Sequence, residues 1–191
     1  MPFRELVLKN RSYRRFHQNV AVSRARLLEL VDLARQCPSA ANAQPLKYLL
    51  LADPETNAKI FPSLRWAGAL KDWPGPAEGE RPAAYIIILL DTRIRSNAGC
   101  DHGIVAQTIL LGATEAGLGG CMLGAIDRPK LKEDLAIPDH FDIALVVALG
   151  KPKETVVLEP LKAGNSTDYY RDAHGVHHVP KRSLEEVVVE F

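Results

Sequence analysis

The sequence lacks the marks of disulfide-stabilised, membrane-spanning and polyanion-binding proteins. Its three cysteines, Cys37, Cys100 and Cys121, are an odd number without a C-x-x-C pair, which argues against a disulfide framework. No apolar run approaches the roughly 18–20 residues that cross a bilayer. Lys and Arg total 24 against 23 Asp and Glu, so the charge of +1 gives no general attraction to polyanions. We expect a cytoplasmic protein with no nucleic-acid or membrane partner.

The composition fits a single globular domain over residues 1–191. Hydrophobic residues make up 47% of the chain and charged residues 25%, and no internal repeat or low-complexity stretch is present. Ser23 is a favourable N-cap, and Leu27, Leu30 and Ala34 follow at helical spacing on one face. These positions predict a helix that ends before Pro38.

Three apolar segments predict the strands of a central sheet. Residues 46–52, 85–90 and 143–149 are strand-sized, and the second is continuous enough to be covered on both faces. Residues 103–116 form a nearly all-apolar helix, which we expect to be buried on almost every side. Helices and strands therefore mix without clean βαβ units, and the predicted fold is α+β with one central sheet.

Two basic segments are candidate anion sites. Near the start of the chain, Arg11, Ser12 and Arg14 lie close to one another and offer guanidinium forks and a hydroxyl to a phosphate. Lys181 and Arg182 precede a capping-box pattern near the end, where cations beside a helix start can complete an anion site. Taken alone, the N-terminal segment is equally compatible with a solvated basic turn, and the pattern at Lys181 and Arg182 favours a surface turn.

A short polar loop follows the first predicted helix. It contains Pro38, Ser39, Ala40, Asn42 and Gln44, which combine small residues with short hydrogen-bonding side chains. Such a loop lets a flat ligand approach the backbone. A plain polar connection is the alternative interpretation.

A glycine-rich passage runs from Gly117 to Gly124. It does not match the dinucleotide fingerprint, because the last glycine position is Met122 and a helix precedes it. What remains is a glycine-rich passage from a helix to a strand, whose exposed backbone amides could face a ligand.

Residues 64–82 are irregular and contain Trp66 and Trp73. A loop of this length suggests a lid over a site, where aromatic planes stack on a substrate. The alternative is that both tryptophans pack in the core.

A histidine cluster near the end superficially resembles a metal site. His174, His177 and His178 lie close to Asp172, but no defined zinc spacing is met and no cysteine is near. We expect no metal, and the sequence assigns the cluster no role.

Together, these segments resemble the nitroreductase family of FMN-dependent flavoproteins. The resemblance spans nearly the whole chain and rests on motifs in a fixed order: Arg11-Ser12-x-Arg14-x-Phe16, Pro38-Ser39-Ala40-x-Asn42-x-Gln44-Pro45, Asp101-x-Gly103-x-x-x-Gln107, Gly117-Leu118-Gly119-x-Cys121-x-x-Gly124, Gly150-Lys151-Pro152 and the terminal Arg182. It implies a sandwich-like α+β fold with a mostly antiparallel sheet flanked by helices. It also implies an intertwined homodimer that binds FMN between its subunits.

The resemblance assigns roles to the candidate residues. Arg11, Ser12 and Arg182, with Lys181 beside them, would hold the phosphate and ribityl chain of FMN, and Arg14 would lie near the pyrimidine edge of the flavin. The flavin ring would be lined by Pro38, Ser39, Ala40, Asn42 and Gln44 of the partner subunit and by Met122, Leu123 and Gly124. Many members carry a basic residue where this chain has Asn10, so Arg15 is an alternative phosphate contact.

The implied activity is transfer of a hydride from NADH or NADPH through FMN to an electron-poor acceptor. Nitroaromatics, quinones and activated alkenes are the expected acceptors, and no protein acid–base residue is expected to be essential, because the flavin carries the chemistry. Dehalogenation, dehydrogenation or fragmentation of flavin on the same fold remain alternatives. So do a flavin-binding protein without turnover and a structural homodimer without flavin.

Overall fold

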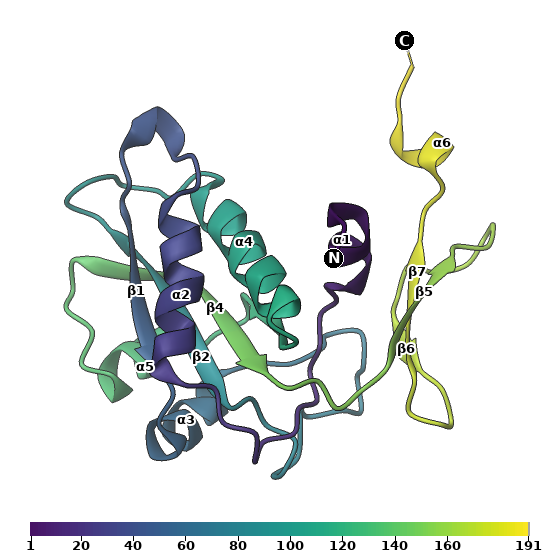
Figure 1. Ribbon diagram of the computed structural model, residues 1–191, viewed down its shortest axis with the longest axis horizontal. Helices are drawn as coiled ribbons and strands as arrows, with labels where there is room; N and C mark the ends of the chain where they lie inside the picture. Colours follow the sequence, from purple (N-terminus) through teal and green to yellow (C-terminus); the bar gives the residue numbers. More distant parts are fainter. Residues whose placement is uncertain (191) are drawn as a thin grey trace.

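The computed structural model describes residues 1–190, which form a central sheet, covering helices and a projecting C-terminal part (Figure 1). The central sheet has the order β1-β2-β4-β3, and every neighbouring pair of strands is antiparallel. Its strands are β1 (Leu46–Leu51), β2 (Ala84–Asp91), β3 (Gly119–Leu123) and β4 (Phe141–Gly150). The predicted α+β class with a mostly antiparallel sheet is confirmed.

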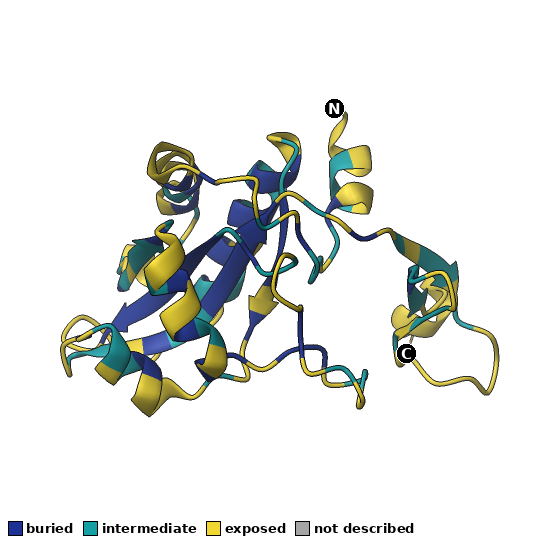
Figure 2. Ribbon diagram, turned by 90° about the horizontal axis from the view of Figure 1, so that it is seen from below, coloured by how far each residue is buried: buried dark blue, intermediate teal, exposed yellow. Residues whose placement is uncertain are grey.

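Strand β2 is the centre of the core, because all eight of its residues are buried (Figure 2). Its side chains alternate between the two faces of the sheet. Ile86 and Ile88 pack toward helices α2 (Arg24–Arg35) and α4 (Asp101–Glu115). Tyr85 and Ile87 join the opposite cluster, together with residues of α3 (Pro54–Ile60) and α5 (Arg128–Asp134). Two helical layers therefore exclude water from both faces.

The helix predicted after Ser23 is confirmed as α2. The Ser23 side chain accepts a hydrogen bond from the backbone N–H of Arg26, which satisfies one free donor of the first turn. Leu27, Leu30 and Ala34 are buried against the sheet, as their spacing predicts.

Helix α4 keeps one exposed face in the single chain. Ile104 is 40% exposed, and Gln107 and Glu115 are also exposed, so burial of α4 on almost every side stays a prediction. The physical reason is that α4 packs on α2 and the sheet from one side only. Its outward face remains available for another surface. No helix within residues 1–190 combines the length and apolarity that a membrane span requires.

A second sheet, which the sequence analysis did not predict, builds the C-terminal arm (residues 153–190). Strands β5 (Val156–Pro160), β7 (His177–Lys181) and β6 (Tyr170–Arg171) pair in that order, and helix α6 (Leu184–Val187) follows. The arm projects from the central body, on the side of the N-terminal helix α1 (Phe3–Lys9) (Figures 1 and 2). The apolar side chains of α6 are open to solvent, with Leu184 72% and Val187 60% exposed.

Candidate functional site

A cationic cavity of about 440 Å³ lies between the N-terminal segment, α4, β3 and the arm. Its lining includes the cations Arg11, Arg14 and Lys181, and none of its lining residues within the described chain is acidic. The other residues that line the cavity are Asn10, Ser12, Gln107, Leu110, Met122, Val156, Tyr169, His177 and Val179. Three positive charges without a carboxylate favour an anionic ligand.

Arg11 has an unsatisfied donor beside this cavity. Its Nη2 donates to the carbonyl oxygen of Val7 at 2.6 Å, whereas its Nε is buried and has no hydrogen-bond partner in the structure. Burial lowers the pKa of Arg11, because a cation is less stable away from water. A buried guanidinium N–H without a partner calls for an acceptor, and an anion supplies one.

Ser12 is fixed by the free edge of the central sheet. It forms an isolated parallel bridge with Gly120 of β3, and the next N–H, of Tyr13, donates to the Gly120 carbonyl oxygen at 3.0 Å. A Cβ on Gly120 would lie 2.2 Å from the carbonyl oxygen of Ala148, so only glycine allows this close approach. The glycine-rich passage thus has a packing role next to the cavity.

The Arg14 guanidinium is held between the N-terminal segment and the arm. Its Cζ lies 4.7 Å from the Tyr169 ring centroid, its Nη1 lies 3.4 Å from His177 Nε2, and Nη1 also donates to the Ser12 carbonyl oxygen at 3.3 Å. The backbone N–H of Arg14 donates to the Glu154 carboxylate. Contacts from two chain regions therefore fix this cation in the cavity wall.

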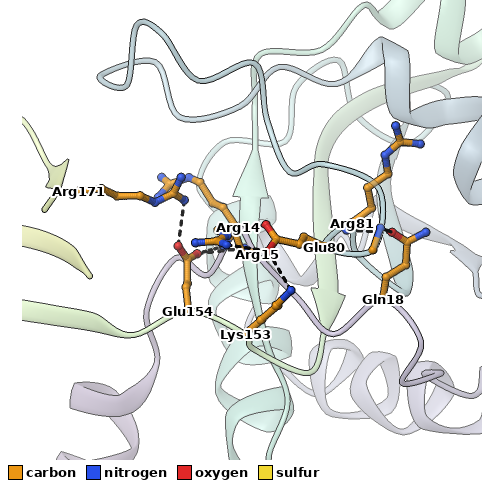
Figure 3. A network of polar contacts seen from close by, with 9 residues as sticks. Arg14, Arg15, Gln18, Glu80, Arg81, Lys153, Glu154 and Arg171 are labelled. Atoms are coloured by element: carbon orange, nitrogen blue, oxygen red, sulfur yellow. Dashed lines mark hydrogen bonds and ion pairs between the residues drawn. The ribbon is translucent and has the colours of Figure 1, made fainter. Parts of the chain in front are cut away.

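Glu154 joins the N-terminal segment to the arm (Figure 3). Its side chain is only 1% exposed, and it accepts hydrogen bonds from the backbone N–H of Arg15 at 3.1 Å and from Arg171 Nη2 at 2.9 Å, in addition to Arg14. A buried carboxylate is tolerated where such donors surround it. Sequence reasoning missed Glu154, since an isolated Glu after a strand resembles any surface residue.

A second ion-pair cluster holds the irregular segment of residues 64–82 near the same place (Figure 3). Both Glu80 carboxylate oxygens accept from Arg15 at 2.6 Å, and Lys153 Nζ lies 3.0 Å from Glu80 Oε1. These donors, Arg15 first, lower the pKa of Glu80 to about 2. Arg15 is thereby occupied within the protein and does not line the cavity, which weakens it as the alternative phosphate contact.

The polar loop of residues 38–44 forms a separate region around Asp101, the first residue of α4. The buried Asp101 carboxylate accepts from Ser39 Oγ at 2.6 Å and from the backbone N–H of Ala40 at 3.1 Å. Ser39 Oγ in turn accepts from the backbone N–H of Gln44 at 3.0 Å. The Asp101 carboxylate therefore anchors this loop to the start of α4.

The loop has an unusual backbone. Ala41, Asn42 and Gln44 have φ angles of 53°, 51° and 49°, a left-handed conformation that residues other than glycine seldom adopt. The Gln44 amide donates to Asn42 Oδ1 at 3.1 Å, which supports the strained turn. Such strain is retained where surrounding contacts hold it and is often found at functional sites.

The cationic cavity and the polar loop are apart in one chain. Pro38, Ser39, Gln44 and Asp101 line a smaller cavity of about 190 Å³, and no residue lines both cavities. Figure 1 shows the loop that follows α2 far from β7, which supplies His177, Val179 and Lys181 to the cationic cavity. A single chain therefore does not bring the two groups of predicted ligand residues together.

The three predicted residues of the glycine-rich passage have different surroundings. Met122 is exposed and lines the cationic cavity, Leu123 is buried in the core, and Gly124 is exposed with its carbonyl oxygen 3.3 Å from Arg128 Nη2. Leu123 is therefore available to a ligand through its backbone alone.

The two predicted cations at the end of the chain also differ. Lys181 lines the cavity, while Arg182 is exposed and pairs with Glu186 at 3.4 Å. In the single chain, Arg182 thus points its charge toward its own helix α6. Asn10, the departure from the family pattern, is buried and lines the cavity.

The tryptophans of residues 64–82 are not equivalent. Trp66 is 7% exposed, packs in the core and stacks on Phe61 with ring centroids 5.8 Å apart. Trp73 is partly buried against the same core, with Arg171 Cζ 4.1 Å from its ring centroid. Core packing, the alternative that the sequence left open, therefore describes Trp66.

The structure separates the three histidines. His174 is exposed, His177 faces the cationic cavity, and His178 lies 3.2 Å from both Glu159 and Asp172. The hydrogen bond to Asp172 is the main cause that raises the pKa of His178. Within residues 1–190, no group of three or more His, Cys, Asp or Glu side chains is placed to hold a metal ion.

The structure is an α+β fold with an antiparallel central sheet and a cationic cavity beside the edge strand β3. Comparison with known proteins identifies the family. The family model described as "Nitroreductase family" matches residues 7–151. The chain belongs to the nitroreductase family.

Relatives and solved structures agree with this assignment. A Methanothermobacter thermautotrophicus protein, provisionally named NADH dehydrogenase/NAD(P)H nitroreductase, is 29% identical over 157 residues, which cover 78% of this chain and 77% of the relative. A nitroreductase family protein from Clostridium novyi NT superposes with a TM-score of 0.67 at 28% identity, covering 80% of this chain and 86% of that one. A protein from Exiguobacterium sibiricum, provisionally named a nitroreductase and solved in complex with FMN, shares the fold with a TM-score of 0.67 at 18% identity, covering 81% of this chain and 90% of that one.

Proposed function

We propose that this protein is an FMN-dependent oxidoreductase that passes a hydride from NADH or NADPH to an electron-poor acceptor. The observation that carries the proposal is the cationic cavity, where Arg11, Arg14 and Lys181 face one space and a buried Arg11 donor has no partner. The nitroreductase match supports it independently. Nitroaromatics, quinones and activated alkenes are the proposed acceptors.

The cavity residues fit a flavin mononucleotide. Arg11, Ser12 and Lys181 provide two cations and a hydroxyl for a phosphate and a ribityl chain. Met122 and Leu110 provide an apolar surface for a ring system. When bound, FMN supplies the hydride chemistry, accepting a hydride from the nicotinamide and passing it to the acceptor.

We further propose that two copies of the chain complete each site. The cavity and the polar loop share no lining residue and lie apart, whereas a flavin ring needs walls on both sides. The loop residues of a second copy would supply the missing wall: Pro38, Ser39, Ala40, Asn42 and Gln44. The outward face of α4, with Ile104 exposed, and the arm, with Leu184 exposed, offer apolar surface for such a dimer.

Arg14 is the proposed electrostatic residue. Its guanidinium is fixed on the cavity wall, and a cation there stabilises negative charge that develops on the pyrimidine edge of a flavin. Replacement by alanine is expected to make the bound flavin harder to reduce, which a midpoint potential measures. An unchanged potential in a flavin-loaded Arg14→Ala variant would remove Arg14 from this role.

The segment of residues 64–82 is proposed as a lid through Trp73 rather than Trp66. Trp73→Leu is expected to change the preference among acceptors, because Trp73 is only partly buried and contacts the arm through Arg171. Trp66→Leu is expected to lower stability instead, since Trp66 packs in the core. Equal acceptor profiles for Trp73→Leu and the wild type would exclude the lid.

The absorbance spectrum of the purified protein is the direct test. We expect a flavin spectrum after addition of FMN, bleaching on anaerobic titration with NADH or NADPH, and recovery on addition of an acceptor. Bound FMN that neither nicotinamide bleaches would indicate a binding protein without turnover. Protein that remains colourless and takes up no FMN would refute the proposal. A panel of nitro, quinone, alkene and halogenated acceptors then separates nitroreduction from dehalogenation.

A further inference from the structure

His177 is a buried side chain of the arm that reaches the cationic cavity. It lies on β7, is 1% exposed, and its Nε2 is 3.4 Å from Arg14 Nη1. The Tyr169 ring is close to both groups, with its centroid 5.1 Å from that of His177 and 4.7 Å from Arg14 Cζ. Neither residue belongs to the motifs that mark the family in this sequence.

The chemistry of the contact fixes the state of the imidazole. A guanidinium has donors only, so in this contact His177 Nε2 accepts and the imidazole is neutral. The proton is then on Nδ1, which is buried and has no hydrogen-bond partner within residues 1–190. Burial lowers the pKa of His177 to about 4, which agrees with a neutral ring. A charged ring would face Arg14 and Arg171 as well, with only Glu154 to offset them.

The arm gives Arg14 contacts that its own segment cannot. Within residues 1–190, the other hydrogen bond of the guanidinium goes to the carbonyl oxygen of Ser12, only two residues away. His177 and Tyr169 belong to the arm, far from Arg14 in sequence. The second sheet gives the arm its structure, and the hydrogen bond from the Arg14 backbone to Glu154 attaches it beside Arg14. His177 and Tyr169 limit both the position and the direction of the charge.

We propose that His177, with Tyr169 beside it, is a positioning residue that holds the Arg14 guanidinium toward the bound flavin. The proposal rests on the proposed FMN function and adds residues of the arm to its site. A cation fixed in place stabilises the negative charge that develops on the flavin when it is reduced. Loss of the contact therefore weakens binding of reduced FMN more than binding of oxidised FMN.

The test compares His177→Phe, His177→Gln and the control His174→Phe, whose histidine is exposed. Dissociation constants for oxidised FMN and midpoint potentials of bound FMN are measured for each variant. His177→Phe removes the acceptor and keeps a ring; the affinity for reduced relative to oxidised FMN is expected to fall about tenfold, equal to a shift of about 30 mV to lower potential for two electrons. His177→Gln retains an acceptor and is expected to restore the potential, while His174→Phe leaves it unchanged.

A double variant separates positioning from a merely structural role. If His177 acts through Arg14, His177→Phe adds no further shift in the Arg14→Ala background. An equal shift in both backgrounds, or no shift in flavin-loaded His177→Phe, would overturn the proposal. Should His177→Phe not fold, Tyr169→Leu removes the other arm contact and must lower the potential in the same direction. Wild-type protein that binds no FMN would instead refute the proposed function.

Discussion

Replacing Glu154 by glutamine tests the attachment of the arm to the central body. One carboxylate oxygen, Oε1, accepts from the backbone N–H groups of Arg14 and Arg15, and the other, Oε2, accepts from Arg171. Glutamine has the same shape but only one acceptor oxygen, so either the two backbone donors or the Arg171 guanidinium loses its partner. The change therefore removes charge and hydrogen bonds without creating a cavity.

The magnitude follows from burial. Removing one partner of a buried ion pair costs about 3–5 kcal/mol, because the remaining charge is left without compensation. Water reaches Arg171, whose side chain is 15% exposed, so we expect a loss of about 2–4 kcal/mol in the free energy of unfolding. With a typical slope of about 2 kcal/mol per molar in urea, the unfolding midpoint falls by about 1–2 M.

Urea unfolding followed by circular dichroism and tryptophan fluorescence measures this loss at a fixed protein concentration. Trp73, which lies against Arg171, makes fluorescence a local reporter. Glu29→Gln is the matched control, since Glu29 pairs with Arg26 on the surface and its loss costs about 0.5 kcal/mol or less. Equal midpoints for Glu154→Gln and Glu29→Gln would refute the reasoning.

Three further predictions concern other parts of the structure. The pKa of Glu80 is lowered in the folded state to about 2 from its ordinary 4.5. The ionised Glu80 therefore stabilises the folded protein fully above about pH 4.5, and this stabilisation is lost as the pH falls toward 2. After allowance for solvent screening it amounts to about 1–2 kcal/mol, which urea unfolding of Glu80→Gln and wild type at several pH values measures. Gly120→Ala places a methyl group 2.2 Å from a backbone oxygen and is expected to cost more than about 2 kcal/mol, whereas Gly68→Ala, which meets nothing within 4 Å, is the control; equal thermal midpoints would contradict this. Asp101→Asn removes one acceptor from the polar loop, so we expect a loss of about 1–3 kcal/mol in the free energy of unfolding, measured in urea. We also expect weaker FMN binding in a titration. An unchanged FMN affinity would show that the loop is not part of the FMN site.

Five elements of the central body, α2, α4, β1, β2 and β4, could be predicted from local pattern. Ser23 and the helical spacing after it mark α2, and the continuous apolar run at residues 85–90 marks the fully buried β2. These signals are readable because capping and burial depend on residues close together in sequence. The second sheet was missed, since its strands are short, only partly buried and interrupted by polar residues such as His178 and Lys181.

The candidate ligand residues could be found from the sequence only as separate segments. Arg11, Ser12 and Arg14 carry a local signature, and the order of motifs points to the family. Glu154 and His177 carry no local signature, because the sequence does not distinguish a buried Glu or a neutral His in a cavity from the same residue type at the surface. Their roles depend on neighbours more than a hundred positions away.

The sequence by itself determined the type and order of the main helices and strands, the family, and the clustering of arginines at the N-terminal segment. The tertiary structure alone decided that Arg11, Arg14 and Lys181 face one cavity, that the loop of residues 38–44 lies elsewhere, and that Trp66 belongs to the core. The physical reason is that local propensities depend on adjacent residues. Charge environment and burial are instead set by packing between distant segments, which the fold creates only once the sheet, helices and arm are in place.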